Sequence, residues 1–299
     1  MLREEKSRNC PTCKSSQIAA EFLVKRKKVK LRVCESCGLV YTASIIKINY
    51  EKFQSKNRDT PKKSFKNRTK YGAYSWRRYV WILNWLRKNN KSIPNKILEV
   101  GTADGANLFP WFLHGSEVEG YDFEDKYLEE GRKIGMNLHN SMKPLSCSYD
   151  LIIISHVLEH LEDPLKTINH LSTFLSKNGF IYIEVPGIYT WLRKFSDRIE
   201  NIDGCTSGDD LDSYFQDEHI SHYSKDSLQN LFANGNFEIV YIDEYIRSII
   251  KRNVLKQNIF AKDIKKNIIQ VKSHLIDVNK SRKSPITIFN KVINKLKNI

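Results

Sequence analysis

Four cysteines near the N-terminus have the spacing of a metal site. Cys10 and Cys13 lie in CPTC, and Cys34 and Cys37 lie in CESCG, so the pattern is C-x2-C-x20-C-x2-C. Each short turn points two thiolates at one centre, which suits a tetrahedral Zn²⁺ ion. We predict a zinc ribbon with short strands between the two pairs. The ion is predicted to be structural, because four cysteine ligands leave no coordination position open for chemistry.

A second candidate site lies in KILEVGTADGANLF, residues 96–109, which is typical of a strand, a glycine turn and the start of a helix. A dinucleotide turn has the pattern G-x-G-x-x-G. In that frame the residues are Gly101, Ala103 and Ala106, a poor match. An acid followed by G-x-G-x-G fits better, with Glu99 as the acid, Gly101 and Gly105 in place, and Ala103 replacing the middle glycine. This turn favours a methyl donor without a phosphate.

The elements around this turn alternate between strand and helix. We predict strands at KILEVG, SEVEGYDF, YDLIIIS and GFIYIEVP, and YDLIIIS has the continuous, β-branched character of a strand buried on both faces. Helices are expected between them, and another at YSWRRYVWILNWLRKN, where apolar residues recur at helical spacing. The pattern predicts a doubly wound, Rossmann-like α/β sheet with its ligand at the carboxyl ends of the strands.

Four motifs in order carry a resemblance to a known family. ILEVGTADGANL, VEGYDFEDKYLEEGRK, YDLIIISHVLEHLEDPLKTI and GFIYIEVPG resemble the successive motifs of class I S-adenosylmethionine-dependent methyltransferases, over about residues 76–245. The ribbon ahead of such a domain also resembles bacterial methyltransferases of sugar and surface-glycan pathways. The resemblance implies an enzyme with S-adenosylmethionine as cofactor and a structural Zn²⁺ ion.

The resemblance also implies roles for single residues. Gly101, Ala103 and Gly105 would let the loop pass under the methionine and ribose portion of the cofactor. Glu99 would orient this loop and meet the amino end of the ligand. Asp122, at the end of the second strand, would accept hydrogen bonds from both ribose hydroxyls, which suits the two oxygens of a carboxylate.

Three further residues are expected around the cofactor. Phe123 would lie against the adenine, Asn140 is the nearest candidate for the adenine amino group, and His156 would line the methionine end. Some oxygen methyltransferases use Glu-x-x-Glu-His to bind Mg²⁺ where this chain has His156-Val-Leu-Glu159-His160. Because His156 stands where that motif has its first Glu, catalytic Mg²⁺ is not favoured.

The acceptor side is expected after EVPG. Enzymes that methylate exocyclic amines of bases usually carry an Asn/Asp-Pro-Pro-aromatic turn at this position. This chain has EVPG instead, which counts against such acceptors. A polar, acidic stretch at about residues 188–218 is predicted to form a lid. His219 and His222 follow it directly, and we predict that one of them is the general base that takes a proton from an acceptor hydroxyl.

Charge divides the chain of 299 residues into zones. The net charge is +18 over residues 1–91, −15 over 92–245 and +12 over 246–299. The basic ends either fold against the acidic centre or meet an anionic partner. We predict a zinc ribbon at 1–45, a basic linker at 46–70, a methyltransferase domain at 71–246 and a basic helical appendage at 247–299. Cys147 and Cys205 are predicted to be ordinary thiols.

Three functions follow from these observations. The favoured one is methylation of a small-molecule acceptor, a sugar or glycan hydroxyl in polysaccharide biosynthesis. The alternatives are an RNA methyltransferase with the basic ribbon as its RNA grip, and a non-catalytic binding module on the same fold. The chain shows neither a secretion signal nor a membrane span, which predicts a cytoplasmic protein. The C-terminal helices are expected to support a homo-oligomer or to touch a membrane surface.

Overall fold

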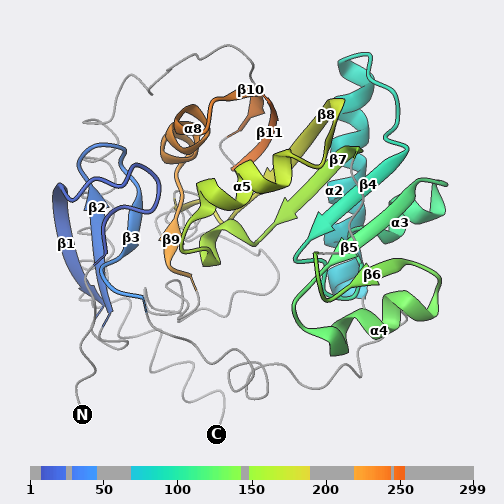
Figure 1. Ribbon diagram of the computed structural model, residues 1–299, viewed down its shortest axis with the longest axis horizontal. Helices are drawn as coiled ribbons and strands as arrows, with labels where there is room; N and C mark the ends of the chain where they lie inside the picture. Colours follow the sequence, from blue (N-terminus) through green and yellow to red (C-terminus); the bar gives the residue numbers. More distant parts are fainter. Residues whose placement is uncertain are drawn as a thin grey trace, which may run out of the picture.

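The computed structural model describes residues 8–24, 29–45, 69–142, 148–188, 219–243 and 246–252. These residues form two sheets, one of four strands and one of seven (Figure 1). Among the described residues, no helix has both the length and the apolar character that crossing a membrane requires.

The seven-stranded sheet confirms the predicted doubly wound α/β fold. Its order is β10-β11-β8-β7-β4-β5-β6, and β8, β7, β4, β5 and β6 are parallel to their neighbours within this group. The strand β11 runs antiparallel to both β8 and β10. The strands are β4 Lys96–Val100, β5 Glu117–Tyr121, β6 Asn137–His139, β7 Tyr149–Ser155, β8 Leu175–Glu184, β10 Phe237–Ile242 and β11 Arg247–Arg252.

Side chains alternate between two hydrophobic cores on either face of this sheet. In β7, Ile152 and Ile154 face one core, whereas Leu151 and Ile153 face the other. The first core contains residues of the helices α5 and α8 and of the cysteine ribbon, and the second contains residues of α2 and α3. Both faces are covered, which explains why the strand is continuously apolar from Leu151 to Ile154. The helices are α2 Thr69–Lys88, α3 Phe109–Leu113, α4 Asp125–Lys133, α5 Pro164–Ser172 and α8 Lys225–Asn234.

The four-stranded sheet belongs to the N-terminal ribbon, but it includes one strand from the far end of the chain. Its order is β1-β2-β3-β9, with β1 Ile18–Val24, β2 Val29–Cys34 and β3 Val40–Thr42. The strand β9, Ser221–His222, pairs antiparallel with β3 and lies beside it in Figure 1. Asn230 of α8 also donates a hydrogen bond of 3.1 Å to the carbonyl of Cys37. The ribbon is therefore packed onto the larger domain.

Two predicted boundaries differ from the structure. The helical appendage was predicted to begin at residue 247, but Arg247–Arg252 form β11 inside the central sheet. The apolar Ile249 and Ile250 point to opposite cores, as an interior strand requires. The helix α2 begins at Thr69, two residues before the predicted start of the methyltransferase domain at residue 71. The rest of the linker, the lid beyond residue 188 and the tail from residue 253 lie outside the described residues, as do Cys147 and Cys205.

Candidate functional site

The glycine turn after β4 requires left-handed backbone at three alternate positions. The φ angles are +74° at Gly101, +48° at Ala103 and +82° at Gly105. A Cβ atom at Gly101 would lie 2.4 Å from a methyl of Val157, and one at Gly105 would lie 2.5 Å from the methyl of Met136. Glycine is therefore required twice for space and for φ, whereas Ala103 holds the left-handed conformation with a side chain.

Glu99 fixes the start of this loop from inside the protein. Its carboxylate is buried and accepts hydrogen bonds from the hydroxyl of Thr102 at 2.8 Å and from Nδ2 of Asn107 at 2.6 Å. Burial raises the pKa of the Glu99 carboxyl to about 7, although both hydrogen bonds act in the opposite direction. A cationic group placed beside it would favour its ionised form.

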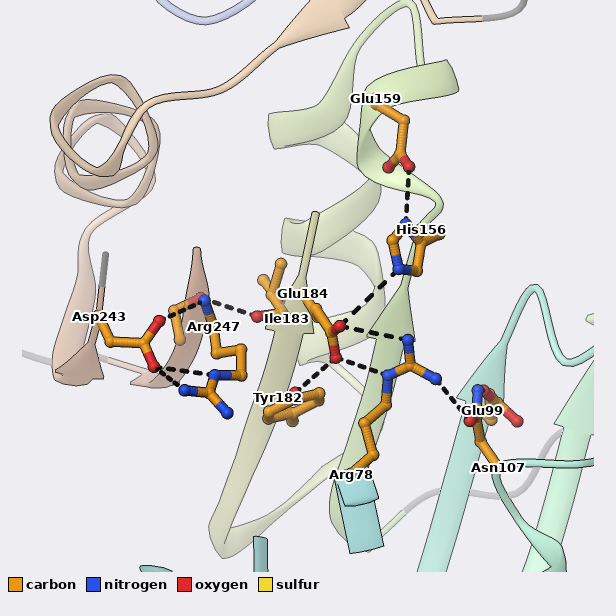
Figure 2. Close-up of polar contacts among 11 residues, drawn as sticks. Arg78, Glu99, Asn107, His156, Glu159, Tyr182, Ile183, Glu184, Asp243 and Arg247 are labelled. Carbon is orange, nitrogen blue, oxygen red and sulfur yellow. Dashed lines mark hydrogen bonds and ion pairs between the residues drawn. The ribbon is translucent and has the colours of Figure 1, made fainter. Parts of the chain in front are cut away.

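An arginine that the sequence did not indicate connects this loop to β8. Figure 2 shows Arg78 of α2 between Asn107 and Glu184. Its guanidinium donates at 2.5 and 3.2 Å to the two oxygens of Glu184 and at 2.8 Å to the side-chain oxygen of Asn107. Burial alone would raise the pKa of Glu184, but the charge and hydrogen bonds of Arg78, together with His156 and Tyr182, outweigh burial and hold that pKa below its ordinary value. The hydroxyl of Tyr182 donates a further hydrogen bond to Glu184 at 2.7 Å.

Asp122 follows β5 and lies against the same loop. It is buried, and it accepts hydrogen bonds from the backbone N–H of Ala103 at 2.9 Å and of Glu124 at 3.1 Å. Phe123, the next residue, is 57% exposed. Asn140 is exposed directly after β6, whose last residue His139 accepts a hydrogen bond from the N–H of Asp122 at 3.0 Å. The predicted ribose and adenine residues thus lie at one edge of the sheet.

His156 follows β7 at the same edge, in a left-handed conformation with φ of +57°. Its ring lies between two acids, with Nδ1 3.5 Å from Glu159 and Nε2 3.8 Å from Glu184 (Figure 2). Through Glu184 and Arg78 it is connected to Asn107 and the cofactor loop. A side chain held in this way sits between the predicted cofactor position and the segment that carries the predicted bases.

The two predicted bases differ in their surroundings. Nε2 of His219 lies 4.0 Å from Glu159, and its ring contacts that of His160 edge-on with centroids 4.8 Å apart. His222 lies in β9, where it pairs with Val40 of the ribbon. Burial lowers the pKa of His222 to about 3, so its imidazole is a weak proton acceptor at neutral pH. Of the two predicted bases, His219 is therefore the one that lies beside Glu159.

The four ribbon cysteines converge as their spacing predicts. The sulfur atoms of Cys10 and Cys37 are 3.5 Å apart, and those of Cys13 and Cys34 are 3.4 Å apart. All four sulfurs lie within 4.8 Å of one another, and three of the residues are buried. Two sulfurs bound to one Zn²⁺ ion at about 2.3 Å lie roughly 3.8 Å apart, so the cluster has the dimensions of a tetrahedral site.

Comparison with known proteins found a family match and several similar solved structures. A model of the methyltransferase domain family matches residues 70–242. No match was found among curated proteins. The plantazolicin methyltransferase BpumL is 16% identical with a TM-score of 0.48, over 69% of this chain and 91% of that chain. An S-adenosylmethionine-dependent methyltransferase from Clostridium acetobutylicum is 14% identical with a TM-score of 0.45, over 68% of this chain and 99% of that chain.

The magnesium protoporphyrin IX methyltransferase of Synechocystis is 14% identical with a TM-score of 0.41, over 60% of this chain and 81% of that chain. The family match covers more than half of the chain, and the chain belongs to the methyltransferase domain family. With the sheet order described above, it is an enzyme of the class I S-adenosylmethionine-dependent type.

Proposed function

We propose that this protein transfers the methyl group of S-adenosylmethionine to a hydroxyl of a sugar or glycan. The cofactor would lie over the turn from Gly101 to Gly105, with its ribose hydroxyls on Asp122 and its ammonium group near Glu99. Phe123 and Asn140 would border the adenine, and His156 would border the methionine end. Each assignment rests on the position of these side chains at one edge of the central sheet.

The single observation that carries the acceptor class is the cluster next to His156. Glu159, His160 and His219 present imidazole and carboxylate groups within 4.8 Å of one another. Such groups suit a neutral, polyhydroxylated acceptor, whose hydroxyls both donate and accept hydrogen bonds. The carboxylate of Glu159 beside these imidazoles would instead disfavour a phosphate backbone. The acidic sequence of residues 197–218 supports the same acceptor class.

Transfer of a tritiated methyl group tests this proposal. The purified full-length protein is incubated with labelled S-adenosylmethionine and either a nucleotide-sugar pool or total RNA. We expect label in the sugar fraction, and loss of that label on Asp122→Ala. Label confined to RNA would overturn the sugar assignment and favour the alternative in which the basic N-terminal region grips RNA.

We further propose that the cysteine cluster binds one structural Zn²⁺ ion that supports the acceptor site. The ribbon pairs with β9, which begins two residues after His219. Elemental analysis is expected to give about one tightly bound zinc in the ribbon of each chain, lost on Cys34→Ser together with thermal stability. If Cys34→Ser removes zinc and leaves thermal stability unchanged, the ion does not support the fold.

We also propose that the basic C-terminal segment mediates homo-oligomerisation. Sedimentation of a chain truncated after Arg252 tests this.

A further inference from the structure

Glu159 is a buried acid that the cofactor site does not use. It lies in the short 3-10 helix η2, Leu158–His160, just beyond β7, and its side chain is 2% exposed. Within the described part of the chain, neither of its carboxylate oxygens has a hydrogen-bond partner. A buried carboxylate without hydrogen bonds is unfavourable unless a cation or a metal ion compensates its charge. Among the described residues, the ion-pair partners of Glu159 are histidines, and no Lys or Arg pairs with it.

Three imidazoles surround this carboxylate without forming hydrogen bonds to it. Oε1 of Glu159 lies 3.5 Å from Nδ1 of His156, 3.9 Å from Nε2 of His160 and 4.0 Å from Nε2 of His219. Ligand atoms that bind one ion at about 2.1 Å lie roughly 3–4 Å from one another. The ligand atoms of Glu159, His160 and His219 all fall within 4.8 Å, close to that spacing.

The fold fixes this arrangement from two distant parts of the chain. Glu159 and His160 are neighbours in η2, while His219 comes from the segment before β9. The backbone N–H of Ile220 donates a hydrogen bond of 2.9 Å to the carbonyl of Glu159, which ties the two segments together. The pairing of β9 with β3 holds the same segment from its other side. His156 keeps its left-handed backbone at the border of the cluster.

We propose that Glu159, His160 and His219 bind a divalent transition-metal ion, distinct from the ion of the cysteine cluster. Two imidazoles and one carboxylate suit Zn²⁺, Fe²⁺, Co²⁺ or Ni²⁺, whereas Mg²⁺ prefers oxygen ligands throughout. Three protein ligands leave further coordination positions open, as in catalytic rather than structural sites. His156, with Nδ1 3.5 Å from Glu159, borders this cluster.

The role of the ion, though not its binding, rests on the proposed function. As a Lewis acid it would hold the acceptor hydroxyl and favour loss of its proton to water. The methyl carbon then forms its bond to the acceptor oxygen as its bond to sulfur breaks, and the sulfur keeps the electron pair. In this arrangement His219 serves as a ligand, and neither predicted histidine has to act as the free base.

Metal titration tests the inference without any acceptor. Full-length protein with zinc in the cysteine cluster is titrated with Co²⁺ and followed by visible absorption and elemental analysis. We expect one further equivalent of Co²⁺, with weak d–d bands and without the intense thiolate charge-transfer band that cysteine ligands give. His219→Ala and Glu159→Gln are each expected to weaken Co²⁺ binding at least about 10- to 100-fold, the range already seen for outer-shell partners.

The controls separate this inference from a loss of fold and from the proposed function. His170→Ala changes an exposed histidine of α5 that contacts Phe174, and it should leave Co²⁺ binding unchanged. Circular dichroism and calorimetry with S-adenosylmethionine on each variant report on folding and on the cofactor site. If the folded wild type binds no further Co²⁺ while it binds S-adenosylmethionine, the metal site is overturned and the proposed function stands. If His219→Ala and Glu159→Gln both bind Co²⁺ as the wild type does, these residues are not ligands.

Discussion

The buried carboxyl of Glu99 makes the stability of this protein depend on pH in a way that one substitution should remove. Its pKa lies at about 7 in the folded protein because burial disfavours the charged form. In the unfolded chain the same group titrates near its ordinary value of 4.5. Between these two values the folded state binds more protons than the unfolded state, so the free energy of unfolding falls as pH rises through that window and is level above it.

The displacement of this pKa corresponds to about 3 kcal/mol, an order-of-magnitude value at 1.36 kcal/mol per unit. Glu99→Gln keeps the shape and the hydrogen bond from Thr102 but cannot ionise. Relative to the wild type, its free energy of unfolding should therefore rise by about 3 kcal/mol between pH 4.5 and pH 7.5. Urea unfolding at fixed zinc concentration, at half-unit steps of pH, measures this difference.

A matched control uses the neighbouring strand. Glu117→Gln changes a carboxylate whose side chain is 64% exposed, and the difference from wild type should then change little with pH. If the difference between Glu99→Gln and wild type is constant from pH 4.5 to pH 7.5, Glu99 is ionised throughout and the burial argument fails. With S-adenosylmethionine present, the proposed contact with its ammonium group should shift the transition toward lower pH.

Two further predictions concern backbone conformation and buried charge. Ala103→Gly should raise the free energy of unfolding by about 1 kcal/mol, because an alanine in a left-handed conformation is sterically strained. Ala106→Gly in the same loop should lower the free energy of unfolding. Equal effects of the two substitutions in urea unfolding would contradict this. Arg78→Met should lower the free energy of unfolding by about 3 kcal/mol, because it leaves the largely buried carboxylate of Glu184 without its ion-pair partner. The exposed neighbour Arg77→Met should have little effect, and a similar loss in both would show that the ion pair is not responsible.

The parts of the fold that follow from local pattern were predictable from the sequence. The strands β7 and β8 contain continuous apolar runs, β4 and β5 carry apolar residues between acids and a lysine, and the turn from Gly101 to Gly105 has its own spacing signal. The strand β11 was missed because RSIIKR has only three apolar or small residues between charged ones, and its neighbour β8 lies far away in the sequence. A short antiparallel strand of this kind is identified by its pairing partners more than by its own residues.

The site was predictable only where its residues fall in one motif. Glu99 and Asp122 were expected because each holds a fixed position in a motif that resembles the methyltransferase family, one before the glycine turn and one at the end of the second strand. Arg78 gave no signal, since a single arginine on an amphipathic helix is usually exposed, and its role depends on Glu184 more than a hundred residues later. The separation of His219 from His222 was also hidden, because only the pairing of β9 with the ribbon buries one ring and leaves the other beside Glu159.

Calorimetry of cofactor binding tests the central assignment most directly. We expect the full-length protein to bind S-adenosylmethionine and not NAD, and Asp122→Ala to weaken that binding by roughly 1–3 kcal/mol through the loss of charge-assisted hydrogen bonds to the ribose. Asp125→Ala, at an exposed acid in the first turn of α4, serves as the control and should bind as the wild type does. Tight binding of NAD without binding of S-adenosylmethionine, or an affinity that is unchanged in a folded Asp122→Ala variant, would contradict the account.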